Sequence, residues 1–116
     1  MLRSQCFPKG ARLRRRMEFL RVQRVGRKHN LGHFVLIAAP GESTTGRLGV
    51  TVSARVGNAV TRNRVKRLVR EVFRTRCPYR GSGNDVVVIA KPGAEVLTNA
   101  EVFCELEAPL AAALRG

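Results

Sequence analysis

The sequence predicts an α+β fold in which one small β-sheet is packed with helices. The chain has 116 residues, of which 44% are hydrophobic, and this suits one compact domain rather than a disordered basic chain. Apolar residues recur at helical spacing in some segments and form short strand-like runs in others. The expected order is helix, strand, strand, helix, strand, helix, with a possible extra short edge strand, in a single domain spanning residues 1–116.

The N-terminal region is expected to contain a flexible arm and a helix. Residues 1–12 are basic and include the helix breakers Pro8 and Gly10. A helix is predicted over Leu13–Val25, with Gly26 as a typical stop. Its apolar residues form two stripes, one of Leu13, Met17 and Leu20 and the other of Phe19 and Val22. Residues 27–32 read as a loop or a short edge strand.

Three strands are expected. The run His33–Ala39 ends at Pro40, and Arg47–Ser53 alternates between apolar and other residues, so these two runs are predicted to form a hairpin. Residues 42–46 read as the turn between them. The run Asp85–Ala90 is continuously apolar after its first residue, which is typical of a strand buried on both faces.

Two further helices have recognisable ends. One is predicted over Ala59–Arg76, with Asn58 as N-cap. Its core-facing side consists of Val65, Leu68, Val69, Val72 and Phe73. The last helix starts at Thr98, which forms a capping box with Glu101, and Pro109 is expected to kink or break it.

The charge distribution indicates a polyanionic partner. The chain holds 22 Lys and Arg against 8 Asp and Glu, a formal net charge of +14. Residues 1–80 hold 20 basic and 3 acidic residues, whereas residues 81–116 hold 2 and 5. Such an excess destabilises the compact state through self-repulsion, and a nucleic acid would relieve it.

The helix over residues 59–76 carries the strongest functional signal. Glu71 is the only acidic residue from Gly57 to Arg76. Arg62 and Arg64 lie in the first two turns, where the helix dipole disfavours cations by roughly 0.3–1 kcal/mol each. A phosphate chain passing this helix end would explain both, because free backbone N–H groups and Arg side chains could grip it together.

Other classes of site and location have little support in the sequence. Cys6, Cys77 and Cys104 form neither a disulfide framework nor a zinc motif, which fits a reducing cytoplasm. His29 and His33 lack an evident third ligand, so no metal site is predicted in the protein. No apolar run is long enough to span a membrane, and none near the start suits a secretory signal.

One long motif resembles a known family. The run RLGVTVSARVGNAVTRNRVKRLVREVFR, residues 47–74, is similar to the signature of the bacterial ribonuclease P protein. Weaker similarity covers the first helix around Phe19, the strand at Phe34–Leu36 and the run at Asp85–Pro92. Members of this family have a fold like domain 2 of ribosomal protein S5.

The resemblance implies a function. The chain would be the protein subunit of ribonuclease P, an endoribonuclease that removes the 5′ leader from precursor tRNA. Its partners would be the ribonuclease P RNA, which is the catalyst and uses Mg²⁺, and precursor tRNA, with no obligatory protein partner and no catalytic residue in this chain. The sparse acidic residues agree with the last point, because metal-assisted phosphodiester cleavage needs clustered carboxylates.

The resemblance also implies site residues. Those expected to bind RNA are Arg55, Asn58, Arg62, Asn63, Arg64, Lys66, Arg67 and Arg70. Those expected in a leader cleft between the first helix and the sheet are Phe19, Ile37 and Ala59. Gln23 and Ile37 stand where the family often has aromatic residues, and Ala54 where it often has a basic one, so this cleft is less aromatic than usual.

Three alternatives share parts of this pattern. A ribosomal or other structural RNA-binding protein would have the same charge and fold without needing the motif at residues 57–67. A nuclease acting without RNA would need the missing carboxylate cluster. A DNA-binding module would read base edges in a groove, whereas the helix over residues 59–76 offers mostly phosphate-type contacts.

Overall fold

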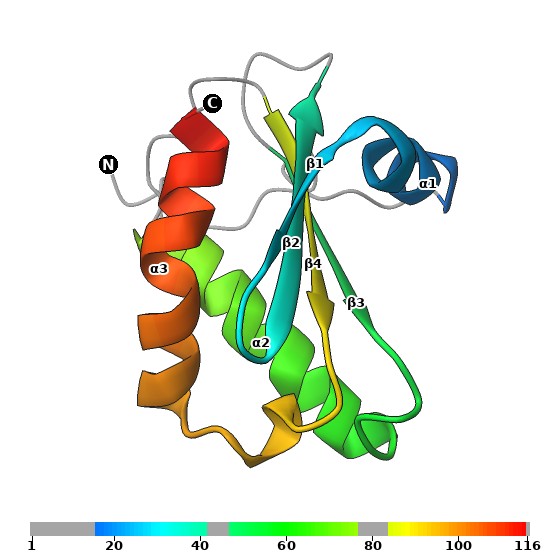
Figure 1. The fold of residues 1–116 in the computed structure, drawn as a ribbon. Helices are drawn as coiled ribbons and strands as arrows, with labels where there is room; N and C mark the ends of the chain where they lie inside the picture. The colour runs from blue at the N-terminus through cyan, green and yellow to red at the C-terminus, as the bar shows by residue number, and fades with distance from the viewer. Residues whose placement is uncertain (1–15, 42–46, 77–83, 116) are drawn as a thin grey trace.

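A computed structural model describes residues 16–41, 47–76 and 84–115 (Figure 1). The elements are α1 (Arg16–Val25), β1 (Arg27–Asn30), β2 (Phe34–Pro40), β3 (Arg47–Val52), α2 (Ala59–Arg76), β4 (Asn84–Ala90), the short 3₁₀ helix η3 (Ala94–Val96) and α3 (Asn99–Arg115). The predicted α+β fold is confirmed, and the optional edge strand is β1. The arm expected at residues 1–12 and the turn at 42–46 lie outside the described residues.

The order of strands in the sheet is β1-β2-β4-β3. Strand β2 is antiparallel to both β1 and β4, and β3 is parallel to β4. The predicted hairpin between residues 33–39 and 47–53 is therefore wrong, because β4 lies between those two strands. The physical reason is the burial of β4: Val86, Val87 and Val88 are each 0% exposed, which requires a neighbour on both sides and cover on both faces.

Helices cover both faces of the sheet (Figure 1). On one face α2 and α3 enclose the larger core, and the five predicted residues of α2, Val65, Leu68, Val69, Val72 and Phe73, are all buried there. On the other face α1 packs on β2 and β4, and Val22 joins Val35, Ile37, Ala39 and Val87 in the smaller core. The apolar stripe that contains Met17 and Leu20 faces solvent, because Met17 is 79% and Leu20 49% exposed.

The helix ends follow the predicted capping chemistry. Asn58 Oδ1 accepts a hydrogen bond from the Thr61 backbone N–H at 2.9 Å. Thr98 and Glu101 form the reciprocal capping box, with Thr98 Oγ1 accepting from Glu101 N at 3.2 Å and Glu101 Oε1 accepting from Thr98 N at 2.8 Å.

Of the kink or break predicted at Pro109, the break is wrong, because α3 continues through this residue to Arg115. An internal proline costs a helix roughly 3 kcal/mol. Leu106 and Leu110, on either side of it, are both 0% exposed. Burying a leucine side chain stabilises by about 1.5–3 kcal/mol, so this pair offsets the loss.

Gly26 brings the end of α1 against the sheet. A Cβ atom at this position would lie 2.6 Å from Ile37 Cγ2 and 2.9 Å from the Ala38 carbonyl oxygen. No side chain fits in that space, so glycine acts here through close approach to β2. The position of α1 over the sheet depends on this contact, and α1 forms one wall of the candidate site.

Candidate nucleic-acid interface

A groove of about 470 Å³ lies where α1, β3 and α2 meet. Because α1 packs on β2 and β4, no helix of the described part of the chain covers the edge strand β3 on that side. The lining residues are Arg16, Phe19 and Leu20 of α1, Val50, Thr51 and Val52 of β3, and Lys66 of α2. The groove therefore lies between the first helix and the edge of the sheet.

The groove combines apolar and cationic side chains. Phe19 is partly buried and packs against the smaller core, yet part of it lines the groove. Arg16 supplies a cation from α1 and Lys66 one from α2. An aromatic ring can stack on a nucleobase while cations contact the flanking phosphates, which is how single-stranded nucleic acids are commonly held.

The exposed side of α2 continues this cationic surface. Asn63 and Arg67 are exposed, and Lys66 and Arg70 are half-buried, on the side away from the larger core. Arg55 is exposed in the turn that leads from β3 to α2. Lys66 connects the two features, since it belongs to α2 and also lines the groove. We call Lys66, Arg67 and Arg70 the α2 strip.

Arg62 and Arg64 both donate hydrogen bonds to backbone carbonyl oxygens of the protein itself. Arg62 Nε donates to the Gly57 carbonyl oxygen at 3.2 Å. Arg64 Nη2 donates to the Leu97 carbonyl oxygen at 3.0 Å, and its guanidinium also reaches the Glu95 carbonyl oxygen and Asn99 Oδ1. These acceptors offset the unfavourable helix dipole without any phosphate. A phosphate contact by Arg64 would have to use its remaining N–H groups.

The remaining predicted residues have varied positions. Asn58 uses its side-chain oxygen as the N-cap of α2, and Ala59 is exposed at the first residue of that helix. Ile37 is 4% exposed in the smaller core. It is not among the residues that line this groove, and its predicted place in a leader cleft stays a prediction.

The structure adds groove residues that the sequence did not identify. Arg16, Leu20 and Thr51 line the groove but were not predicted site residues. Thr51 had a usable signal, because strand alternation places it on the opposite face from Leu48, Val50 and Val52. Leu20 also had a usable signal, since it belongs to an apolar stripe of α1 that is separate from the stripe of Phe19 and Val22.

Other candidate chemistry is limited in the described residues. No group of at least three His, Cys, Asp or Glu side chains there could hold a metal ion. His33 Nδ1 lies 2.9 Å from Glu105 Oε1, which ties the start of β2 to α3. Over residues 16–41, 47–76 and 84–115, no helix is long and apolar enough to cross a membrane.

Comparisons with known proteins agree on one family. The family model described as Ribonuclease P matches residues 7–114. The ribonuclease P protein component of Desulforapulum autotrophicum is 43% identical over 103 residues, covering 89% of this chain and 88% of the relative. That of Dictyoglomus thermophilum is 42% identical over 90 residues, covering 78% and 75%.

Solved structures give the same result. The Staphylococcus aureus RNase P protein has a TM-score of 0.79 at 28% identity, covering 91% of this chain and 99% of that protein. The RNase P protein from Thermotoga maritima has a TM-score of 0.76 at 30% identity, covering 90% and 96%. Together with the motif at residues 47–74 and the fold, these matches show that the chain belongs to the ribonuclease P protein family.

Proposed function

We propose that this chain is the protein subunit of a ribonuclease P holoenzyme, acting in the cytoplasm. It binds the ribonuclease P RNA and holds the 5′ leader of precursor tRNA, and so assists removal of the leader to give the mature tRNA 5′ end. The α2 strip contacts RNA phosphates, and the groove between α1 and β3 receives the single-stranded leader. Catalysis, and the Mg²⁺ that it uses, belong to the RNA subunit.

One observation carries the assignment of the leader to the groove. Phe19, Arg16 and Lys66 bring an aromatic ring and two cations to one groove of about 470 Å³, next to the α2 strip. Proteins that bind single-stranded nucleic acids commonly combine these two kinds of side chain, one for the base and one for the flanking phosphates. The family membership supplies the partners, and the chain's net charge of +14 supplies the long-range attraction to them.

Cleavage of precursor tRNA tests the subunit assignment. A bacterial ribonuclease P RNA is assayed at low, near-cellular Mg²⁺ with and without this protein, and the protein alone is the control. We expect efficient cleavage only when RNA and protein are both present. Cleavage by the protein alone would overturn the assignment of catalysis to the RNA. No effect of the protein on any bacterial ribonuclease P RNA would overturn the subunit assignment.

Phe19→Leu tests the groove. Leucine keeps most of the packing against the smaller core but cannot stack on a base. Loss of one stacked base is expected to weaken binding of precursor tRNA to the holoenzyme by about 10-fold, within the roughly 1–3 kcal/mol that such stacking contributes. Mature tRNA, which lacks a leader, serves as the matched ligand and should bind equally to both proteins. Equal weakening for both ligands would place the effect of Phe19 outside the leader groove.

A further inference from the structure

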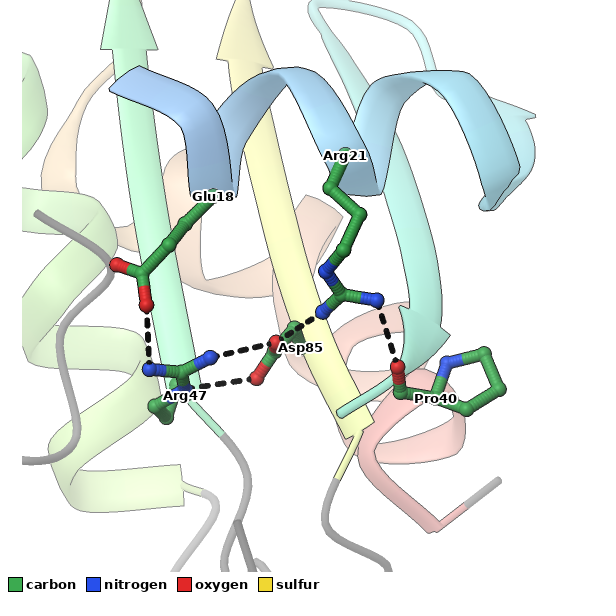
Figure 2. A network of polar contacts seen from close by, with 5 residues as sticks. All are labelled: Glu18, Arg21, Pro40, Arg47 and Asp85. Atoms are coloured by element: carbon green, nitrogen blue, oxygen red, sulfur yellow. Dashed lines mark hydrogen bonds and ion pairs between the residues drawn. The ribbon is translucent and has the colours of Figure 1, made fainter. Parts of the chain in front are cut away.

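A network of ion pairs around one buried carboxylate attaches α1 to the sheet (Figure 2). At its centre is Asp85, whose side chain is 0% exposed at the start of β4. Arg47, at the start of β3, is the direct neighbour of Asp85 in the sheet. Arg47 Nε donates to Asp85 Oδ1 at 3.0 Å and Nη2 to Oδ2 at 2.8 Å, a bidentate pair within the sheet.

Helix α1 contacts both members of this pair. Glu18 Oε2 accepts from Arg47 Nη1 at 2.8 Å. Arg21 Nη2 donates to Asp85 Oδ2 at 2.6 Å, and Arg21 Nη1 donates to the Pro40 carbonyl oxygen at 3.0 Å. Acidic and basic side chains thus alternate through the network in the order Glu18, Arg47, Asp85 and Arg21 (Figure 2). The formal charges of these four side chains cancel.

The network lies on the far side of α1 from the groove. Successive residues of a helix turn by about 100°. Glu18 and Arg21 therefore project from the side of α1 opposite to Arg16 and Leu20, which line the groove. The network holds α1 towards the starts of β3 and β4, while the groove opens beside Val50–Val52, near the end of β3.

Apart from this network, α1 contacts the sheet through one buried side chain, the partly buried Phe19 and the close approach of Gly26. Val22 is the only buried residue of this helix. A helix with so small an apolar contact can shift or tilt on the sheet unless polar contacts fix it. Any such shift changes the distance between Phe19 on α1 and Lys66 on α2, and hence the spacing that a base and its phosphate encounter.

We infer that Glu18 and Arg21 are positioning residues for the leader: by anchoring α1 to the Arg47–Asp85 pair, they set the width of the groove. This inference rests on the proposed function of the groove. Neither residue touches the leader in this arrangement, since both side chains are engaged on the opposite side of α1.

The double variant Glu18→Gln/Arg21→Met removes both ion pairs between α1 and the sheet and leaves the Arg47–Asp85 pair intact within the sheet. It leaves the net charge unchanged, so a loss of binding cannot come from lost long-range attraction. A matched control is Glu71→Gln/Arg74→Met, because Glu71 and Arg74 are also a Glu and an Arg three residues apart on one helix, but they pair with each other and not with the sheet. Arg21→Lys retains a cation beside Asp85 and tests rescue.

The experiment compares holoenzyme cleavage of precursor tRNAs with a long leader and with a one-nucleotide leader. For the wild type we expect a lower KM with the long leader. The double variant is expected to lose about 10-fold or more of this leader-dependent advantage, with kcat unchanged, since a small misplacement is costly where geometry matters. The control keeps the advantage, and Arg21→Lys restores part of it. Hydrogen exchange is expected to be faster in α1 and unchanged in β4.

The outcomes separate the two claims. If the wild type shows no leader-length dependence, the groove does not hold the leader and the proposed function fails together with this inference. If the wild type shows it and the double variant keeps it in full, the leader assignment stands and the positioning role of Glu18 and Arg21 is wrong. Equal losses in the double variant and the Glu71/Arg74 control would also overturn the positioning role.

Discussion

Replacing Lys66, Arg67 and Arg70 together with Gln is expected to weaken binding to the ribonuclease P RNA by about 10²-fold at 0.15 M salt. Each cation that neutralises an RNA phosphate releases condensed counterions, which adds roughly 0.7–0.9 to the slope of log affinity against log salt concentration. Three lost contacts make that slope shallower by about 2–3. The measurement is a titration of RNA binding at several salt concentrations.

The matched control is Arg24→Gln/Arg27→Gln/Lys28→Gln. It removes the same formal charge from exposed positions at the end of α1 and on the edge strand β1. We expect a smaller loss, because these residues lie outside the α2 strip and the groove. If both variants lose the same affinity and the same slope, the attraction is a property of the net charge and the α2 strip is not the interface.

The helix that carries the basic surface was predictable because its signals are local. The apolar residues of α2 recur every three or four positions, so one face had to be buried whatever the rest of the fold does. Asn58 and the turn before it mark the start, and the structure places the helix over Ala59–Arg76 as predicted. The position of the α2 strip follows from the same periodicity.

The order of the strands was not predictable from local patterns. Residues 33–39 and 47–53 are neighbours along the chain, and sequential strands often pair. The burial of Val86–Val88 instead requires β4 between them, and this depends on contacts between residues more than thirty positions apart. The same limit applies to Ile37, since its burial depends on where α1 lies.

The bonding partners of charged residues were equally unpredictable from local sequence patterns. From the sequence, Arg64 was interpreted as a cation that binds a phosphate at a position where the helix dipole disfavours positive charge. Its acceptors, the Glu95 and Leu97 carbonyl oxygens, lie 31 and 33 residues further along the chain. Asp85 appeared as an acidic residue at the start of an apolar strand, and its partners Arg47 and Arg21 lie 38 and 64 residues before it.

Asp85→Ala is expected to lower the free energy of unfolding by about 3–5 kcal/mol, the cost of removing one partner from a buried ion pair. The Asp85 side chain is 0% exposed, and the Arg47 side chain is 18% exposed. The hydrogen bond that Arg47 donates to Asp85 is the largest factor that raises the pKa of Arg47. An arginine stays protonated even without such a partner, so removing the carboxylate leaves an uncompensated cation. Urea unfolding measures the loss, with a stabilising osmolyte added to both proteins if the variant is largely unfolded.

The triple variant Arg21→Met/Arg47→Met/Asp85→Ala distinguishes the two causes of such a loss. Replacing a whole buried ionic network with apolar side chains is often neutral or stabilising, because no charge is left without a partner. Glu18 keeps part of its hydration, since its side chain is 28% exposed. We therefore expect the triple variant to regain most of the stability that Asp85→Ala loses. A triple variant as unstable as the single one would mean that lost packing at the start of β4, rather than uncompensated charge on Arg21 and Arg47, dominates the energetics of this network.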